Sequence, residues 1–262
     1  AALIFGMRWL PASSGARKPI RPLAVLLLGG GLFGLVYGLE HGNEAGWTSA
    51  TVIGSLAGGA LLLALFVMRE RKREQPLIRL SLFRNRTYSA LMFAGFWMNA
   101  GVFAAIFLLT LFLQQAQGYS ALEAGVREMA WTGCTMIAAP LAGLAAGRFG
   151  SRPVLAVGLL LQTLALAGFG LLIASQGVDF PFGYQAPLLM MAGTGMGLSF
   201  TPLSHGIMSA VSDRHADEAS GMNNAVRELG GVFGIAIGGM IFRIGAEPAT
   251  PEAFGTHIVP SL

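Results

Sequence analysis

The stretch "RERKREQPLIRLSLFRNR", residues 69–86, carries seven basic residues and two acidic ones. The stretch immediately before it, "IGSLAGGALLLALFVM" at residues 53–68, contains no charged residue. An uncharged run of this length that ends in a basic segment is typical of a helix that crosses a bilayer and emerges on the cytoplasmic side. The two stretches together therefore indicate an integral membrane protein.

Composition supports this interpretation. Charged residues make up 11% of the 262 residues, whereas a soluble domain has about 25%. The net charge of +4 gives no reason to expect nucleic acid as a partner, because the basic residues lie in loops between apolar runs. The one cysteine, Cys134, excludes an internal disulfide and a cysteine-based zinc site, and it is interpreted as a small packed residue. We expect no metal and no cofactor.

A bilayer core of about 30 Å requires about 20 helical residues. Six stretches meet this length, and a seventh is equally apolar but contains glycine and proline. The sequence therefore predicts an all-α fold, a polytopic transmembrane helix bundle with about seven spans. The predicted spans are residues 22–40, 49–68, 88–113, 122–146, 153–175, 186–211 and 219–242. Since residues 1–7 resemble the end of an earlier span, we expect a longer protein.

Basic residues alternate from one connection to the next. Fourteen of the 17 Lys and Arg fall in connections on one side, which the positive-inside rule assigns to the cytoplasm. Residues 69–86 and 212–218 are therefore predicted to be cytoplasmic, and residues 43–48 and 176–184 external. The basic loop attracts anionic membrane lipid. Its "QPLIRLSLF" segment fits either a short amphipathic helix on the membrane surface or a plain linker.

Two parts of the sequence resemble the major facilitator superfamily. In "GLAAGRFGSRPVL", residues 143–155, four positions match the loop motif that joins two helices in each half of these transporters, although Gly147 replaces its aspartate: Gly143, Arg148, Gly150 and Arg152. "ASGMNNAVRELGGVFGIAIGG", residues 219–239, is similar to the penultimate helix of the fourteen-helix drug/proton antiporter branch. "SALEAGVREMAW" (120–131) and "LFRNRTY" (82–88) resemble the same branch.

This resemblance implies a domain organisation. The regions are the end of a span and a cytoplasmic linker (1–21), two extra central transmembrane helices (22–68), the basic cytoplasmic loop (69–86), five helices of the carboxy-terminal transporter bundle (87–243) and an external loop before a missing last helix (244–262). The amino-terminal bundle of the same chain is then a missing partner.

The resemblance also implies a function. It predicts part of a secondary active transporter in the bacterial inner membrane, a proton-driven exporter of drugs or other amphipathic small molecules that works by alternating access. Its partners are then a small-molecule substrate, a proton and membrane lipid. A permease of the same fold for a narrow solute remains an alternative. A membrane-embedded enzyme is a further alternative, but the sequence lacks the clustered acids or histidines that it needs.

Ionisable side chains within a span are costly and usually face the protein interior. The candidates for the substrate cavity or for coupling are Arg127, Glu128, Trp131, Asn223, Asn224, Arg227 and Glu228. Pairing between helices or snorkelling to the interface is the alternative for the charged members. Glycines four residues apart predict close helix packing within the membrane, at Gly54 and Gly58, Gly193 and Gly197, and Gly234 and Gly238.

Overall fold

A computed structural model describes residues 22–71, 80–212 and 215–245 of the chain. Seven long helices account for almost all of these residues, and they confirm the predicted helical bundle. The helices are α2 (Pro22–Ala45), α3 (Ala50–Arg71), α4 (Arg86–Leu111), α5 (Ala121–Phe149), α6 (Ser151–Gln176), α7 (Phe182–Ser209) and α8 (Ala216–Gly245). A 3-10 turn (η1, Leu80–Arg84) precedes α4, and a π-helical turn (η2, Phe112–Ala116) follows it.

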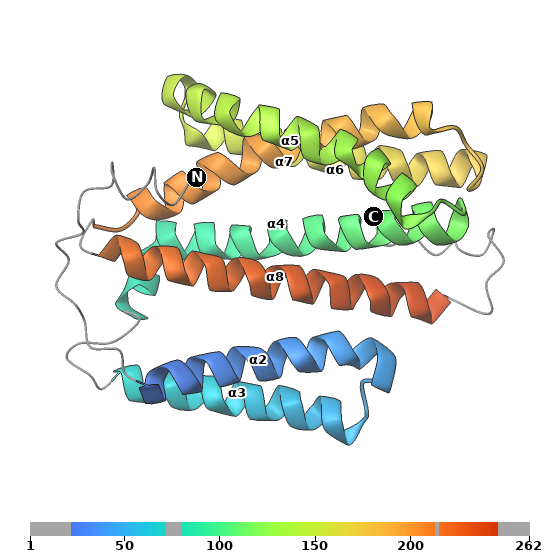
Figure 1. The fold of residues 1–262 in the computed structure, drawn as a ribbon. Coiled ribbons are helices and arrows are strands. Elements are labelled where there is room, and N and C mark those ends of the chain that lie inside the picture. Colours follow the sequence, from blue (N-terminus) through green and yellow to red (C-terminus); the bar gives the residue numbers. More distant parts are fainter. Residues whose placement is uncertain (1–21, 72–79, 213–214, 246–262) are drawn as a thin grey trace, which may run out of the picture.

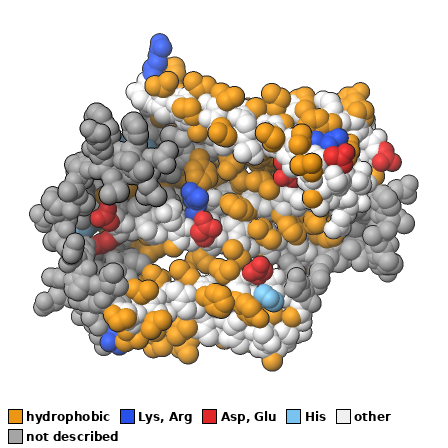
Figure 2. All heavy atoms as spheres, in the orientation of Figure 1, with side chains coloured by type: hydrophobic (Ala, Val, Ile, Leu, Met, Phe, Trp, Pro, Cys, Tyr) orange, Lys and Arg blue, Asp and Glu red, His pale blue; other side chains and the backbone are white. Residues whose placement is uncertain are grey.

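Within the described residues, five helices are long and apolar enough to cross a membrane: α2, α3, α4 with η2, α5 and α6. The other two, α7 and α8, have 28 and 30 residues and are therefore also long enough to cross a bilayer. Few charged side chains appear on the face in Figure 2, where apolar side chains predominate. Large apolar side chains such as Leu122 and Leu144 are exposed, as expected where lipid is the solvent.

The helices form three groups (Figure 1). In one group, α7 packs against both α5 and α6, and in the second, α4 pairs with α8. The third is the α2–α3 pair, which contacts α8 through α2. The predicted segment 1–21 lies outside the described residues, as do residues 246–262 of the predicted external loop (244–262) and residues 72–79 of the basic loop.

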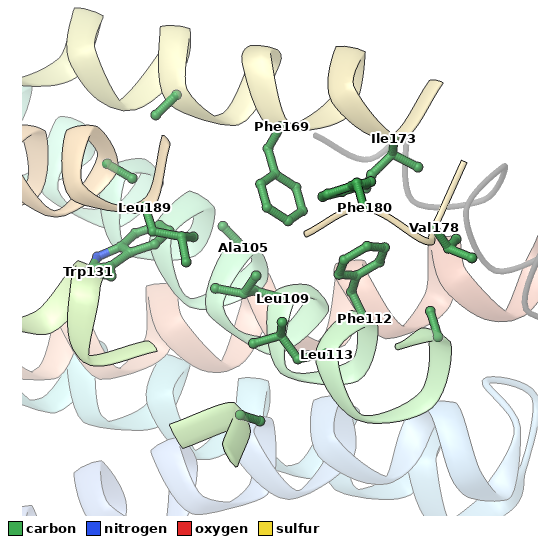
Figure 3. Packing of buried hydrophobic residues seen from close by; sticks show 14 of the residues in the cluster. Ala105, Leu109, Phe112, Leu113, Trp131, Phe169, Ile173, Val178, Phe180 and Leu189 are labelled. Carbon is green, nitrogen blue, oxygen red and sulfur yellow. The ribbon is translucent and has the colours of Figure 1, made fainter. Parts of the chain in front are cut away.

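The largest buried cluster joins α4, α5, α6 and α7 (Figure 3). Phe112 packs edge-on against Phe169 and is stacked on Phe180, while Trp131 and Leu189 extend the same cluster. A second cluster forms around Tyr88, at the start of α4. These clusters hold α4 to the α5–α7 group.

Glycines set the closest contacts between helices. Gly193 and Gly197 of α7 lie against α5, and Gly195 between them lies against α6. A Cβ atom at Gly195 would lie 2.6 Å from the Gly158 carbonyl oxygen, so a side chain there would force the helices apart. Gly234 of α8 is similarly close to Ala100 of α4.

Some predicted packing glycines have no such role in the described structure. Added Cβ atoms at Gly54 and Gly58 meet nothing within 4 Å, because the tight contact of α3 is made one position further on, at Gly59. Gly238 leaves room for a Cβ, with the nearest atom 3.7 Å away. Four-residue spacing therefore identified the helix face correctly on α7 but the wrong face on α3.

Candidate functional site

Glu128 is placed inside the bundle by the first turns of α5. The helix begins with a capping box at Ser120, and Glu128 follows Ala121 by seven residues, or about 10 Å along the axis. Its Oε1 atom lies 2.6 Å from Oγ1 of Thr110, near the end of α4. Both side chains are partly buried. Thr110 was absent from the predicted site. It lies about as many residues before the turn that joins α4 to α5 as Glu128 lies after that turn.

The Thr110 hydroxyl has two acceptors within reach. Its Oγ1 is 2.9 Å from the carbonyl oxygen of Ile106 and 2.6 Å from Glu128. A hydroxyl donates one proton and accepts others. It therefore donates to Glu128 when the carboxylate is ionised. When Glu128 is protonated, the carboxyl group can donate to Thr110, which then donates to Ile106. The pair is thus hydrogen-bonded in both protonation states.

Arg127 points away from Glu128 and toward the connections at this end of the bundle. Its guanidinium carbon lies 3.6 Å from the ring centroid of Tyr119, and 5.6 Å from that of Phe182. Its Nη1 donates to the carbonyl oxygen of Glu123 at 3.0 Å. Arg127 thereby ties the α4–α5 connection to the start of α7. This geometry favours the structural interpretation of Arg127 over a place in the substrate cavity.

Two glutamines reinforce the same end of the bundle. Gln117 Nε2 donates to the carbonyl oxygens of Val178 (2.9 Å) and Phe180 (3.2 Å). The fully buried Gln185 donates from Nε2 to Gln117 Oε1 at 2.8 Å. No sequence pattern predicted this network, because a glutamine at a helix end is usually exposed to the interface.

Trp131 belongs to the apolar core. It is buried, and its Nε1 lies 3.4 Å from the sulfur of Met196 on α7. Beside it is a small apolar cavity of about 20 Å³, enough for roughly one water molecule, which Leu109, Phe169 and Leu189 also line (Figure 3). The indole therefore packs between α5 and α7 in the described structure, and the place of Trp131 in the substrate cavity stays a prediction.

Arg227 lies about three turns after the start of α8. The helix α8 starts at Ala216, three residues before the predicted start, so Arg227 is about 16 Å along its axis. Its guanidinium carbon is 4.8 Å from the ring centroid of Phe200 on α7. Its Nη2 is 4.0 Å from Glu228 Oε1, at the outer limit for an ion pair. The Arg227 side chain remains 35% exposed and that of Glu228 72%.

The two asparagines precede Arg227 on the same helix. Asn223 is half-buried and Asn224 is exposed. They lie three and four residues before Arg227, so they are one turn away from it on the same face of α8. The structure therefore separates two of the predicted charged residues: Glu128 lies with Thr110 near one end of the bundle, and Arg227 lies with Phe200 nearer its middle.

The loop motif lies at the turn between α5 and α6. Gly150 follows the last residue of α5 and precedes the first residue of α6. Its φ of +88° is a conformation that favours glycine. Arg148 lies over the ring of Phe149 with its guanidinium carbon 5.4 Å from the centroid, and Arg152 is exposed. Gly143 is exposed, and a Cβ there would come no closer than 3.8 Å to Thr201.

The helical architecture agrees with a comparison to known protein families. Residues 11–235 match the model of the Major Facilitator Superfamily. The chain belongs to the major facilitator superfamily. It is therefore an integral membrane protein of a family of transporters and not of enzymes, as the sequence predicted.

Three curated relatives of the chain are bacterial proteins. The chain is 31% identical to the methylenomycin A resistance protein of Bacillus subtilis, over 94% of this chain and 52% of that protein. It is 30% identical to the tetracenomycin C resistance and export protein of Streptomyces glaucescens, over 100% of this chain and 48% of that protein. It is 32% identical to the multidrug resistance protein Stp of Mycobacterium tuberculosis, over 87% of this chain and 43% of that protein. The chain thus spans about half the length of the curated relatives it matches.

Proposed function

We propose that the chain is the carboxy-terminal portion of a proton-driven exporter of drugs or other amphipathic small molecules, in the fourteen-helix drug/proton antiporter branch. The names of its relatives support the substrate class, since they refer to drug resistance and export. In this proposal α4–α8 are five helices of the carboxy-terminal bundle, and α2 and α3 are the two extra central helices. The other bundle of the same protein completes the cavity, and transport proceeds by alternating access.

The observation that carries proton coupling is the Glu128–Thr110 hydrogen bond. A proton carrier within a membrane protein must be stable both with and without its proton, because an unsatisfied polar group in an apolar region is costly. The Thr110 hydroxyl meets this requirement because it can donate to Glu128 when the proton is absent, and to the carbonyl oxygen of Ile106 when the proton is bound. We assign Glu128 as a site that takes up and releases a proton during transport.

Arg227 has a different role in the proposal. A charge at its depth costs at least about 2.5 kcal/mol without compensation. The contacts described for it are the Phe200 ring and an ion pair at the limit of distance. Arg227 is therefore available to an acidic group of the substrate or of the other bundle, with Asn223 and Asn224 supplying amides nearby. Movement of such a partner would couple cavity opening to binding.

The test uses the complete protein in a bacterial strain that lacks its major drug exporters. We expect the protein to lower accumulation of ethidium, an amphipathic cationic dye, and a protonophore to abolish the effect. Glu128→Gln removes the carboxyl group that would carry the proton and should abolish coupled export at unchanged expression. Thr110→Val should reduce it, whereas the control Thr163→Val should not, because the exposed Thr163 bonds only to the Leu159 carbonyl oxygen of its own helix.

Two outcomes would contradict the proposal. Dye export that persists at full rate in Glu128→Gln would remove Glu128 from coupling. Absence of export for dyes and drugs, together with uptake of a sugar or peptide by the same protein, would assign it to a permease for a narrow solute.

A further inference from the structure

A groove of about 520 Å³ opens between the first turns of α2 and the last turns of α3. Its volume is within the range of about 300–1,000 Å³ that is usual for sites of small ligands. Four apolar side chains and two arginines line it: Leu23, Leu27, Leu65, Met68, Arg69 and Arg71. The apolar part thus runs along the helices, and the positive charge is gathered at the end of α3.

The groove results from a change in residue size along the helix pair. Near the middle, α2 and α3 are in backbone contact, and a Cβ at Gly59 would lie 2.7 Å from the Leu35 amide nitrogen. Toward the end of α3 the facing residues are leucine and methionine, and because these side chains are larger the two backbones are no longer in contact there. Leu65 is 41% exposed and Met68 is 55% exposed, so the groove opens to the outside of the bundle.

The charges at the groove are of one sign. Arg69 and Arg71 are exposed and line it, whereas Glu70 between them is buried and does not. The helix α2 begins at Pro22, and the amide groups of a first helical turn have no acceptor within the helix. These amides and the two arginines both favour an anion at the mouth of the groove.

We propose that this groove binds an anionic glycerophospholipid. The phosphate lies at Arg69 and Arg71, and an acyl chain runs along Leu27 and Leu65. The alternating charge of the connections places this end of α3 at the cytoplasmic surface, where anionic lipids attract basic residues, and basic pockets between helices at that surface suit acidic headgroups. Figure 2 shows apolar side chains over the α2–α3 pair with a basic side chain at one end of it.

The test measures lipid retention by native mass spectrometry of the complete, delipidated protein titrated with phosphatidylglycerol or phosphatidylcholine. We expect one phosphatidylglycerol molecule to be retained in preference to phosphatidylcholine. Arg69→Gln with Arg71→Gln should weaken its binding by about fivefold for each arginine removed. The control is Arg148→Gln with Arg152→Gln, which removes two exposed arginines elsewhere and should leave retention unchanged.

A second variant separates a built site from general electrostatic attraction. Leu27→Trp with Leu65→Trp fills the groove while keeping both arginines, and Leu65 is exposed enough to accept the larger side chain. We expect this variant also to lose the retained phosphatidylglycerol. Retention in either groove variant equal to that of the unmodified protein would overturn the proposal, as would equal retention of phosphatidylcholine.

A labelling experiment distinguishes lipid from the other available occupants, which are the flanking parts of the chain and the remainder of the protein. A cysteine in place of Leu65, with Cys134→Ala, should react with a membrane-permeant maleimide faster after lipid is removed, and slowly again after phosphatidylglycerol is added. Protection that does not depend on lipid would show that protein fills the groove, and the proposal would be wrong.

Discussion

The contact between α4 and α8 provides a sharp test of how glycines hold this bundle together. Gly230 and Gly238 are two turns apart on the face of α8 that packs against α4. A Cβ at Gly230 would lie 2.5 Å from the carbonyl oxygen of Phe96, whereas a Cβ at Gly238 would come no closer than 3.7 Å to any atom. Real Cβ atoms keep at least 3.0–3.4 Å from their neighbours. Gly230→Ala must therefore move the helices apart by about 0.5–0.9 Å.

The expected magnitudes follow from this geometry. Both alanine variants gain about 1 kcal/mol of helix propensity. Overpacking costs Gly230→Ala about 1–3 kcal/mol, a cost that Gly238→Ala avoids. We expect the melting temperatures of the two variants to differ by about 1–6 °C, with Gly230→Ala the lower, because the shift for each kcal/mol falls as the chain becomes longer. The assay is thermal unfolding of the complete protein in detergent, followed by the loss of the monodisperse peak in size-exclusion chromatography. Equal melting temperatures would refute the packing argument.

Other predictions concern charged side chains and topology. Arg227→Ala should abolish export at normal expression, and Arg227→Lys should restore it only in part because lysine lacks the planar guanidinium; loss of expression together with export would instead show a structural role. Arg127→Lys should lower the melting temperature through weaker stacking on Tyr119, with export retained, and loss of export without loss of stability would contradict this role. A cysteine at residue 72 should resist an impermeant maleimide added outside intact cells, and one at residue 48 should react.

Sequence patterns predicted the helices well because they depend on a strong constraint. A chain that crosses lipid must satisfy its backbone within helices, and hydropathy therefore locates the helices to within a few residues. The start of α5 was equally predictable, since Ser120 and Glu123 form a capping box visible in the sequence. Gly150 matched a known loop motif, and its positive φ explains why glycine suits that position.

The site was less predictable because side-chain direction depends on neighbouring helices. Arg127 and Glu128 are adjacent in sequence, yet one stacks on Tyr119 while the other bonds to Thr110. Trp131, one turn further, enters the apolar core instead. Helical spacing alone gives the angular position of each residue but not which helix it meets. Thr110 and Glu128 lie at similar numbers of residues before and after the α4–α5 connection. This similarity is the one feature of the sequence that could have predicted their contact.

The most direct test of the central claim is transport by the complete protein in sealed proteoliposomes with an imposed pH gradient. The proposed exchange of an amphipathic cation for protons predicts that ethidium accumulates inside when the interior is acidic, and that an ionophore collapsing the gradient releases it. Protons should leave as dye enters, and Glu128→Gln should stop both movements together. Dye accumulation that is indifferent to the pH gradient, or unchanged in Glu128→Gln, would contradict proton-driven export through this bundle.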